Sequence, residues 1–328
     1  MNAPRYNVYS EIAQLPTNGI HDICVAIGVF DAVHLGHQAI IRELISRARA
    51  YQATPVVITF DPLPPTIVNP ELGVRRLLTL EHRYKLLSEL GVEAIVCLPF
   101  TAEFAQRSPD EFCMDLFECP GLAVKALCVG RRWRFGAGAS GDIEFLSRFI
   151  QQRQKSVEIV AIPELYRDHE RISTTRIRNS IARGDFVCAK KLLGREYSLW
   201  GPVSKGRGIA GNVLHYPTAN LDVSGMVVPP AGIYAGKACL QGKSLPGIIY
   251  LGSSPTFNQN ESDPILEIHL FDFSQQIYGQ YIEVFFLKFI REERKFPSAA
   301  MLIRQIEQDI FEAKRYHQQQ GDSAHGLS

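Results

Sequence analysis

The sequence predicts an α/β domain built on a parallel sheet, followed by a small antiparallel β-barrel domain with a C-terminal helix. From residue 22 to about residue 185, apolar runs typical of buried strands alternate with runs of helical spacing. This alternation favours a parallel sheet covered by helices. Short strand-like runs separated by glycine and proline turns follow, as in small barrels. We therefore expect two domains, at residues 1–186 and 187–328, a division that suits a chain of 328 residues.

In the first domain, each expected strand is followed by an expected helix, except the last strand. The strands are expected at residues 23–30, 55–60, 94–100, 125–130 and 156–162, and the helices at 36–51, 80–90, 109–118 and 142–154. Ligands of parallel sheets bind beyond the carboxyl ends of the strands. We therefore expect a site near His34, His37 and Asp61, which follow the first two strands.

In the second domain, the expected strands are short and no long helix interrupts them. They are placed at residues 201–203, 232–240, 247–251, 265–273 and 281–290, with a closing helix at about 298–319. The helix has apolar side chains at helical spacing, among them Ile303, Ile306 and Ile310.

Composition excludes several classes of protein. A hydrophobic content of 46% and a charged content of 21% are those of an ordinary globular chain. A net charge of +1 gives no reason to expect a nucleic-acid polymer as partner. We expect no membrane span and no signal peptide, because no apolar run is long enough. Seven scattered cysteines without a Cys-x-x-Cys pair favour a reduced, cytoplasmic protein and no cysteine metal site.

The segment His34-Leu-Gly-His37 indicates phosphate chemistry. It lies between an expected strand and an expected helix, where backbone N–H groups lack intrahelical partners and the helix dipole is positive. Two histidines three residues apart can lie on one face there, and Gly36 lets a ligand approach the backbone. The alternative is two histidines in an ordinary loop.

A second polar segment runs from Arg171 to Arg178, Arg-Ile-Ser-Thr-Thr-Arg-Ile-Arg. Its hydroxyl groups can cap a helix, and its arginines offer forked donors, which together suit a departing phosphate chain. Read alone, the segment also fits a capped surface helix with solvated arginines.

In the second domain, Thr218 and Asn220 stand two residues apart, so on a strand their side chains point the same way. Such oxygen ligands suit Mg²⁺ held jointly with substrate phosphates. Glu267 places a carboxylate in an otherwise apolar strand and shares a face with His269. That face could be the inside of the barrel or its wet exterior, and periodicity alone favours the exterior.

Two signatures of the first domain resemble a known family. Gly28-Val-Phe-Asp-Ala-Val-His-Leu-Gly-His37 and Ser173-Thr-Thr-Arg-Ile-Arg178 are similar to the signatures of the nucleotidyltransferase superfamily, whose domains are Rossmann-like. The first of them resembles, more narrowly, the amino-terminal module of prokaryotic bifunctional riboflavin kinase/FAD synthetases. In the second domain, Pro217-Thr-Ala-Asn220, Glu267-Ile-His-Leu270 and the segment 290–296 resemble the riboflavin kinase module of these enzymes. The likeness covers roughly residues 20–315.

The resemblance implies roles for individual residues. His34 and His37 would stabilise the transferring phosphate, Glu267 would be the base on the ribityl hydroxyl, and Arg291 would lie near the flavin. Thr218 and Asn220 would hold Mg²⁺ and nucleotide phosphates. The other residues implied in binding the nucleotide and its phosphates are Gly28, Phe30, Asp31, Gly36, Ser173, Thr175 and Arg178.

The implied activity is the phosphorylation of riboflavin to FMN by ATP with Mg²⁺, and the adenylylation of FMN to FAD. The implied partners are ATP, riboflavin, FMN and FAD, and the oligomeric state stays open. One alternative is a kinase-only protein, or a nucleotidyltransferase acting on a modified flavin or another metabolite. A second is a non-catalytic flavin- or nucleotide-binding regulator.

Several positions depart from the family pattern: Ala32, Leu63, Arg132, Asn212, His215 and Tyr250. Arg132 stands where the family offers a hydrogen-bond acceptor, and a guanidinium has none. It could grip a phosphate instead, or it could turn into solvent while Trp133 packs.

Overall fold

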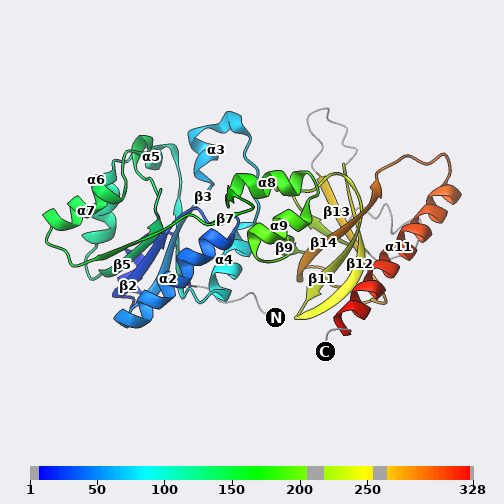
Figure 1. Ribbon diagram of the computed structural model, residues 1–328, viewed down its shortest axis with the longest axis horizontal. Coiled ribbons are helices and arrows are strands. Elements are labelled where there is room, and N and C mark those ends of the chain that lie inside the picture. The colour runs from blue at the N-terminus through cyan, green and yellow to red at the C-terminus, as the bar shows by residue number, and fades with distance from the viewer. Residues whose placement is uncertain (1–6, 205–217, 254–263, 326–328) are drawn as a thin grey trace. The chain divides into compact units, whose positions relative to one another are not determined.

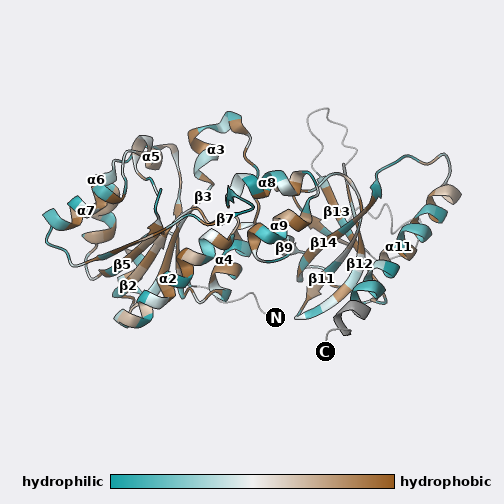
Figure 2. Ribbon diagram, viewed as in Figure 1, coloured by the Kyte–Doolittle hydropathy of each residue, from teal (hydrophilic) through white to brown (hydrophobic). Residues whose placement is uncertain are grey.

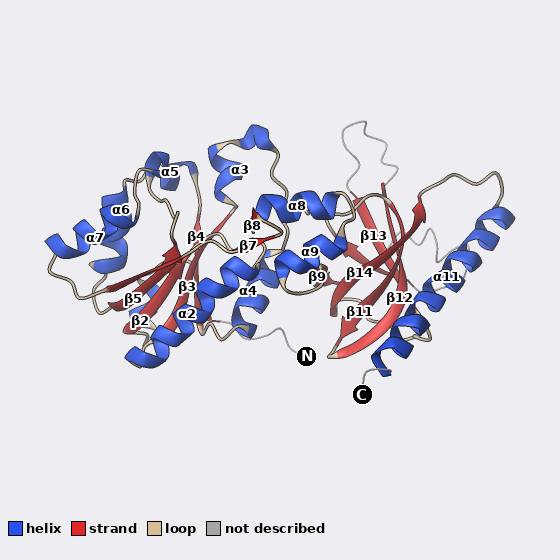
Figure 3. Cartoon of the chain, in the orientation of Figure 1, coloured by secondary structure: helices blue, strands red, loops and turns tan. Residues whose placement is uncertain are grey.

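The structure, a computed structural model, describes residues 7–204, 218–253 and 264–325. It divides into two compact units, one formed by the chain up to residue 174 apart from residues 77–79, the other by those three residues and the chain from residue 175 onward. The domain boundary expected at residues 186 and 187 stays a prediction. Each unit contains one of the two expected sheets (Figure 3).

The first unit is built on a six-stranded parallel sheet of order β1-β4-β3-β2-β5-β6 (Figure 1). Its strands are β1 (Asn7–Tyr9), β2 (Asp22–Ile27), β3 (Thr54–Asp61), β4 (Ala94–Pro99), β5 (Ala123–Gly130) and β6 (Glu158–Ile162). The longer helices are α2 (Leu35–Tyr51), α4 (Leu80–Glu89), α6 (Pro109–Phe117) and α7 (Ile143–Gln152). The predicted alternation of strand and helix is confirmed, and all five strand pairs are parallel.

Helices cover the sheet because its strands are apolar on both sides, as their brown colour in Figure 2 shows. Ile23, Val25 and Ile27 of β2 belong to the core cluster that includes residues of α6 and α7. The alternate residues Cys24 and Ala26 are equally buried, and α2 contacts β2, β3 and β5. A strand buried on both faces is typical of parallel sheets.

Short elements complete the first unit. They are α1 (Gln14–Thr17), α3 (Pro64–Val68), α5 (Ala102–Ala105), the 3₁₀ helices η1 (Pro70–Leu72) and η2 (Ala137–Ala139), and the pair β7 (Tyr166–Arg167) and β8 (Glu170–Arg171). None has enough residues to show a hydrophobic period, which is why periodicity did not predict them.

The second unit is a six-stranded antiparallel sheet of order β10-β13-β12-β11-β14-β9. Its strands are β9 (Ser198–Pro202), β10 (Thr218–Asp222), β11 (Gly232–Leu240), β12 (Lys243–Ser253), β13 (Pro264–Leu270) and β14 (Tyr281–Glu292), and its helices are α8 (Thr174–Ala182), α9 (Phe186–Leu193) and α11 (Ala299–His325). An antiparallel bridge between Ser204 and Asn220 joins the two edges of the sheet. The predicted barrel with a C-terminal helix is thereby confirmed.

Along β13, side chains alternate between two faces, and the residues named below are buried except His269, which is half-buried. Leu266, Ile268 and Leu270 lie on one face, and Glu267 and His269 on the other. Helix α11 contacts β11, β12 and β14, and its Ala313 packs with Ala235 of β11. The second face is therefore covered by α11 instead of being open to water.

Candidate functional site

The first candidate site is the loop that joins β2 to α2. Strand β2 was expected to reach residue 30, but it ends at Ile27, and the backbone of Phe30 and Val33 has positive φ, 51° and 42°. A strand cannot continue through such angles, so the chain turns away from the sheet. His34 is the N-cap of α2, and its Nδ1 accepts a hydrogen bond from the backbone N–H of His37 (3.2 Å).

The two histidines stack on each other at the start of α2. Their ring centroids are 3.6 Å apart and their ring planes are nearly parallel. The buried Phe30 ring meets His37 edge-on, with the ring centroids 5.1 Å apart. A Cβ at Gly36 would lie 3.0 Å from Cε1 of His34, so the glycine leaves room for the histidine ring. The structure thus brings His34, His37 and Gly36 together as the sequence predicts.

The neighbouring residues of this loop are buried. Asp31 is 2 % exposed and His34 is 7 % exposed. A Cβ at Gly28 would lie 3.1 Å from the Phe30 ring, so a larger side chain there would displace Phe30. The binding roles expected for Gly28, Phe30 and Asp31 stay predictions.

The second polar segment begins a helix, as expected. Ser173 directly precedes α8, which starts at Thr174, and the helix buries Ile177 and Ile181. Thr175 is exposed, and Arg178 is half-buried. Hydroxyl groups at a helix start beside a guanidinium suit a phosphate, and the roles of Ser173, Thr175 and Arg178 stay predictions.

In the second unit, register pairs align five residues across neighbouring strands. Asn220 pairs with Glu267, Glu267 with Tyr250, Tyr250 with Ile233, and Ile233 with Arg291. Side chains of directly opposite residues lie on the same face of a sheet. The neighbouring pair of Thr218 and His269 extends the same face.

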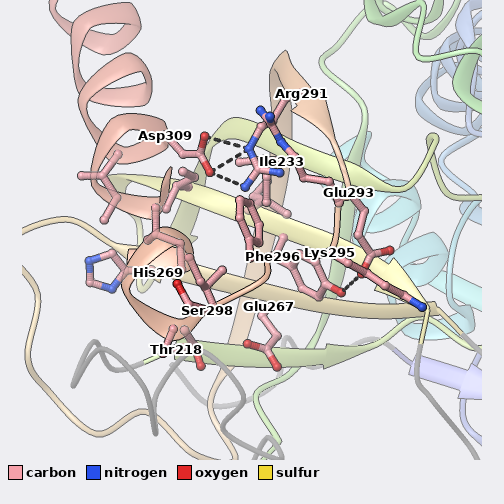
Figure 4. A pocket seen from close by; sticks show the side chains of 18 of the residues that line it. Thr218, Ile233, Glu267, His269, Arg291, Glu293, Lys295, Phe296, Ser298 and Asp309 are labelled. Carbon is pink, nitrogen blue, oxygen red and sulfur yellow. Dashed lines mark hydrogen bonds and ion pairs between the residues drawn. The ribbon is translucent and has the colours of Figure 1, made fainter. Parts of the chain in front are cut away.

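A cavity of about 660 Å³ lies over this face (Figure 4). Its other wall comes from residues 293–299 and from α11, through Leu302, Ile306, Asp309 and Ile310. Thr218, Glu267 and Arg291 all line it, so the structure brings these predicted residues to one cavity. Apolar cavities with a few convergent polar groups are typical ligand sites.

Glu267 is buried on the cavity face, at 4 % exposure. The exterior position that periodicity alone favours is therefore not the one observed, because α11 and the segment before it cover this side of the sheet. Burial raises the pKa of the Glu267 carboxyl above its ordinary value of 4.5, since the charged form loses hydration. A raised pKa in a cavity is typical of an acid–base group.

Tyr250 lies opposite Glu267 on the neighbouring strand and also lines the cavity. Its hydroxyl donates a hydrogen bond to Oε1 of Glu293 (2.5 Å), which ties β12 to the segment after β14. Burial and this hydrogen bond raise the pKa of the Tyr250 phenol, so it stays protonated at neutral pH. A Cβ at Gly252 would overlap the Tyr250 hydroxyl, so Gly252 makes room for this tyrosine.

Arg291 is held by α11. Its Nε and Nη2 donate to both carboxylate oxygens of Asp309, at 2.6 to 3.0 Å, and Gln305 donates to the same carboxylate. Asp309 is a site residue that the sequence did not bring to notice, and Tyr250 was noted only as a departure from the family pattern. The signal for Asp309 was a charged residue between Ile306 and Ile310 on the apolar side of the helix.

Oxygen donors of the kind that a divalent cation binds stand on β10, where Thr218 lines the cavity. Thr218 and Asn220 offer neutral oxygens on β10, beside the Glu267 carboxylate, and such hard donors suit Mg²⁺ that also binds phosphates. Within residues 7–204, 218–253 and 264–325, no group of three histidine, cysteine or acidic side chains could hold a metal by itself. Substrate phosphates and water would complete the coordination of such a cation.

For Arg132, which departs from the family pattern, the structure decides between the two alternatives expected from the sequence. Its side chain is 71 % exposed and pairs with Glu164 (2.7 Å), while Trp133 stacks on Phe135 at 4.4 Å. Arg132 thus turns into solvent while Trp133 packs, which is one of the two alternatives. Ala32 and Leu63 are buried, and Asn212 and His215 lie outside the described residues.

Fold and site define a two-unit protein in which a nucleotidyltransferase-like parallel-sheet unit precedes an antiparallel barrel with a buried glutamate. Residues 18–176 match the family model for FAD synthetase, and residues 193–317 match that for riboflavin kinase. The chain therefore belongs to the bifunctional riboflavin kinase/FMN adenylyltransferase family.

Individual relatives agree with this membership. The bifunctional riboflavin kinase/FMN adenylyltransferase of Buchnera aphidicola subsp. Schizaphis graminum is 34% identical, over 91% of this chain and 97% of its own. That of Pseudomonas fluorescens is 35% identical, over 90% and 96%. A Streptococcus pneumoniae crystal structure described as a macrolide-efflux protein has a TM-score of 0.75 at 28% identity, and covers 92% of this chain and 96% of that one. Among the described residues, no helix is both long and apolar enough to cross a membrane.

Proposed function

We propose that this chain makes FAD in two steps: its barrel unit phosphorylates riboflavin with ATP, and its parallel-sheet unit adenylylates the resulting FMN. The observation that carries the proposal is the buried Glu267 in an apolar cavity beside Thr218 and Asn220. A carboxylate there has a basicity raised by burial and lies close to oxygen donors for a metal–phosphate complex.

In the first step, Glu267 accepts the proton of the terminal ribityl hydroxyl of riboflavin. The freed oxygen forms a bond to the γ-phosphorus of ATP, the bond from that phosphorus to the β-phosphate oxygen breaks, and ADP leaves. Thr218 and Asn220 would hold Mg²⁺, which offsets negative charge on the phosphates. The apolar cavity wall under α11 takes the flavin ring, with Arg291 held near it by Asp309.

In the second step, a phosphate oxygen of FMN attacks the α-phosphorus of a second ATP, and pyrophosphate leaves. No covalent intermediate with the protein is needed, since positioning and charge stabilisation suffice. His34 and His37 donate to the oxygens of the transferring phosphate. Gly28, Phe30, Asp31 and Gly36 shape the nucleotide loop. The seven free cysteines suit a reducing compartment such as the cytoplasm.

The test is to incubate purified protein with riboflavin, ATP and Mg²⁺ and to separate the flavins by chromatography. We expect FMN followed by FAD, and neither product when a chelator removes the metal. FMN without FAD would contradict the second step, and riboflavin left unchanged would contradict the first. Supplying FMN in a parallel reaction tests the second step by itself.

A further inference from the structure

Arg83, on α4, is a cation buried at the carboxyl end of the parallel sheet. The residue is 1 % exposed. Its Nη1 donates to the carbonyl oxygens of Val29 (2.7 Å) and Phe60 (3.1 Å) and to the hydroxyl of Thr59 (3.2 Å). Its Nη2 lies 3.5 Å from Oδ1 of Asp61. A buried charge is costly unless it is paired and hydrogen-bonded, so this set of partners explains why the guanidinium is tolerated there.

The partners of Arg83 belong to two neighbouring chain segments just where the pairing of β2 with β3 stops. The last backbone–backbone hydrogen bond between these segments joins the Gly28 N–H to the Ile58 carbonyl (3.1 Å). One residue later on each side, the guanidinium contacts Val29 and Thr59 and thereby continues the connection. A planar fork of donors can serve several acceptors at fixed angles, whereas a lysine ammonium cannot reproduce that geometry.

The contact at Val29 fixes the entry to a strained turn. The Val29 carbonyl belongs to the peptide bond that leads into Phe30, whose φ is 51°, and Val33 has a φ of 42°. Such angles are unfavourable for bulky residues and persist only where the surroundings impose them. The Val29 carbonyl accepts a second hydrogen bond from the Thr59 hydroxyl (3.0 Å), so Arg83 and Thr59 hold it together.

Phe30 connects the fixed Val29 peptide to the two histidines, because its ring contacts His37. Its ring meets His37 edge-on at 5.1 Å, and His37 stacks on His34 at 3.6 Å. We propose that Arg83 is a positioning residue for adenylyl transfer: it fixes the peptide between Val29 and Phe30, and thereby sets where the histidine pair stands. This inference rests on the function proposed for the first unit. Arg83 acts through the loop and need not touch the substrate.

The test compares Arg83→Lys and Arg83→Met with wild-type protein in FMN adenylylation, with riboflavin phosphorylation measured on the same preparations. A displacement of about 1 Å at a reacting group can cost about 10²-fold in rate. We expect kcat for adenylylation to fall about 10- to 10²-fold in both variants, with the KM for ATP changed much less and with kinase activity unchanged. Thr59→Val, which keeps the side-chain shape, should lower the same kcat by a smaller factor.

The matched control is Arg47→Met. Arg47 lies on α2, the helix that carries His37, but near the opposite end of that helix. Its loss removes ion pairs to Glu43 on the same helix and to Glu158 on β6. Adenylylation should stay at the wild-type rate in this control. Wild-type kcat in both Arg83 variants would overturn the inference. So would a deficit that disappears at temperatures well below the melting transition, because it would then reflect unfolded protein.

A second measurement does not depend on the activity. The ring-nitrogen resonances of His34 and His37 should shift in Arg83→Lys and in Thr59→Val, and should stay in place in Arg47→Met. Unchanged resonances in all three variants would overturn the positioning role. If the wild-type protein makes no FAD from FMN, the proposed function fails, and the resonances still decide whether Arg83 places the histidines.

Discussion

The burial of Glu267 affects both its proton affinity and the stability of the folded protein. Because its pKa is raised in the folded protein, the folded state binds more protons than the unfolded state between the ordinary pKa of 4.5 and the raised value. The free energy of unfolding therefore falls as pH rises through this window. As a base, Glu267 works only when ionised, so activity changes in the opposite direction.

We accordingly expect riboflavin phosphorylation to lose rate on acidification at a pH above the ordinary range of glutamate. Glu267→Gln should lack this acid limb and lower kcat by about 10² to 10⁴, as is usual for loss of a general base. It should unfold at no lower temperature than wild type at neutral pH, because it removes a buried charge. The pH profile of kcat/KM and a thermal melt check both parts. A variant with normal turnover would show that Glu267 is not the base.

Tyr250 gives a prediction about substrate binding. Tyr250→Phe removes the hydrogen bond to Glu293 and loosens the segment that covers the cavity. Hydrogen bonds to charged groups contribute about 1.5–3 kcal/mol, and less where the partner is exposed. We therefore expect the riboflavin KM to rise about threefold to tenfold while kcat changes little. Tyr281→Phe, at an exposed tyrosine of the same barrel, is the control, and an equal effect there would contradict the prediction.

At the scale of elements, one buried ion pair contributes to the docking of α11. Arg291 and Asp309 have side chains that are 13% and 3% exposed, and loss of one partner leaves the other charge buried. Asp309→Ala should therefore lower the unfolding free energy of the barrel unit by about 3–5 kcal/mol. The control Glu312→Ala lies on an exposed face of the same helix and should change it by less than about 0.5 kcal/mol.

The two tryptophans make this measurement possible, because Trp133 lies in the first unit and Trp200 in the second. In a Trp133→Phe background, denaturant unfolding followed by fluorescence reports the barrel unit through Trp200 alone. A stability loss in Asp309→Ala no larger than in Glu312→Ala would contradict the importance of the ion pair.

The elements that the sequence predicted are those whose burial produces a regular spacing of apolar residues in the sequence. Strands β3 and β5 and helices α2 and α6 appear close to their expected bounds, because one or both faces meet an apolar core. The end of β2 was misplaced, because the apolar run continues to Phe30 while the backbone turns. Helix α9 has apolar residues at helical spacing, but its eight residues are few for a period to stand out.

The site was predictable where it has a sequence signature and hidden where it depends on tertiary contacts. The histidine pair, the common direction of Thr218 and Asn220, and the face shared by Glu267 and His269 follow from local spacing. Which face of the barrel α11 covers cannot be derived from strand alternation, so periodicity alone did not predict the burial of Glu267. Arg83 was equally hidden, although it precedes Leu87 by one helical turn and so stands on the buried side of α4.

At the scale of the whole molecule, the histidine pair and Glu267 lie in different units, so single substitutions should separate the two proposed reactions. His37→Ala removes one donor to the transferring phosphate and should lower FMN adenylylation by about 10²–10³. Riboflavin phosphorylation should continue, and FMN should accumulate. Chromatography of the flavins measures both steps in one reaction, and an equal loss of both activities would contradict the two-site assignment.

Mixing His37→Ala with Glu267→Gln extends this test to the intermediate. Each variant alone should make almost no FAD from riboflavin, because one cannot complete the second step and the other cannot begin the first. If FMN leaves one molecule and enters another through solution, the mixture should form FAD after a lag that shortens as protein concentration rises. A trap that binds free FMN should suppress FAD formation in the mixture. Failure of the mixture to make FAD, while Glu267→Gln alone converts added FMN, would show that FMN is not released to solvent.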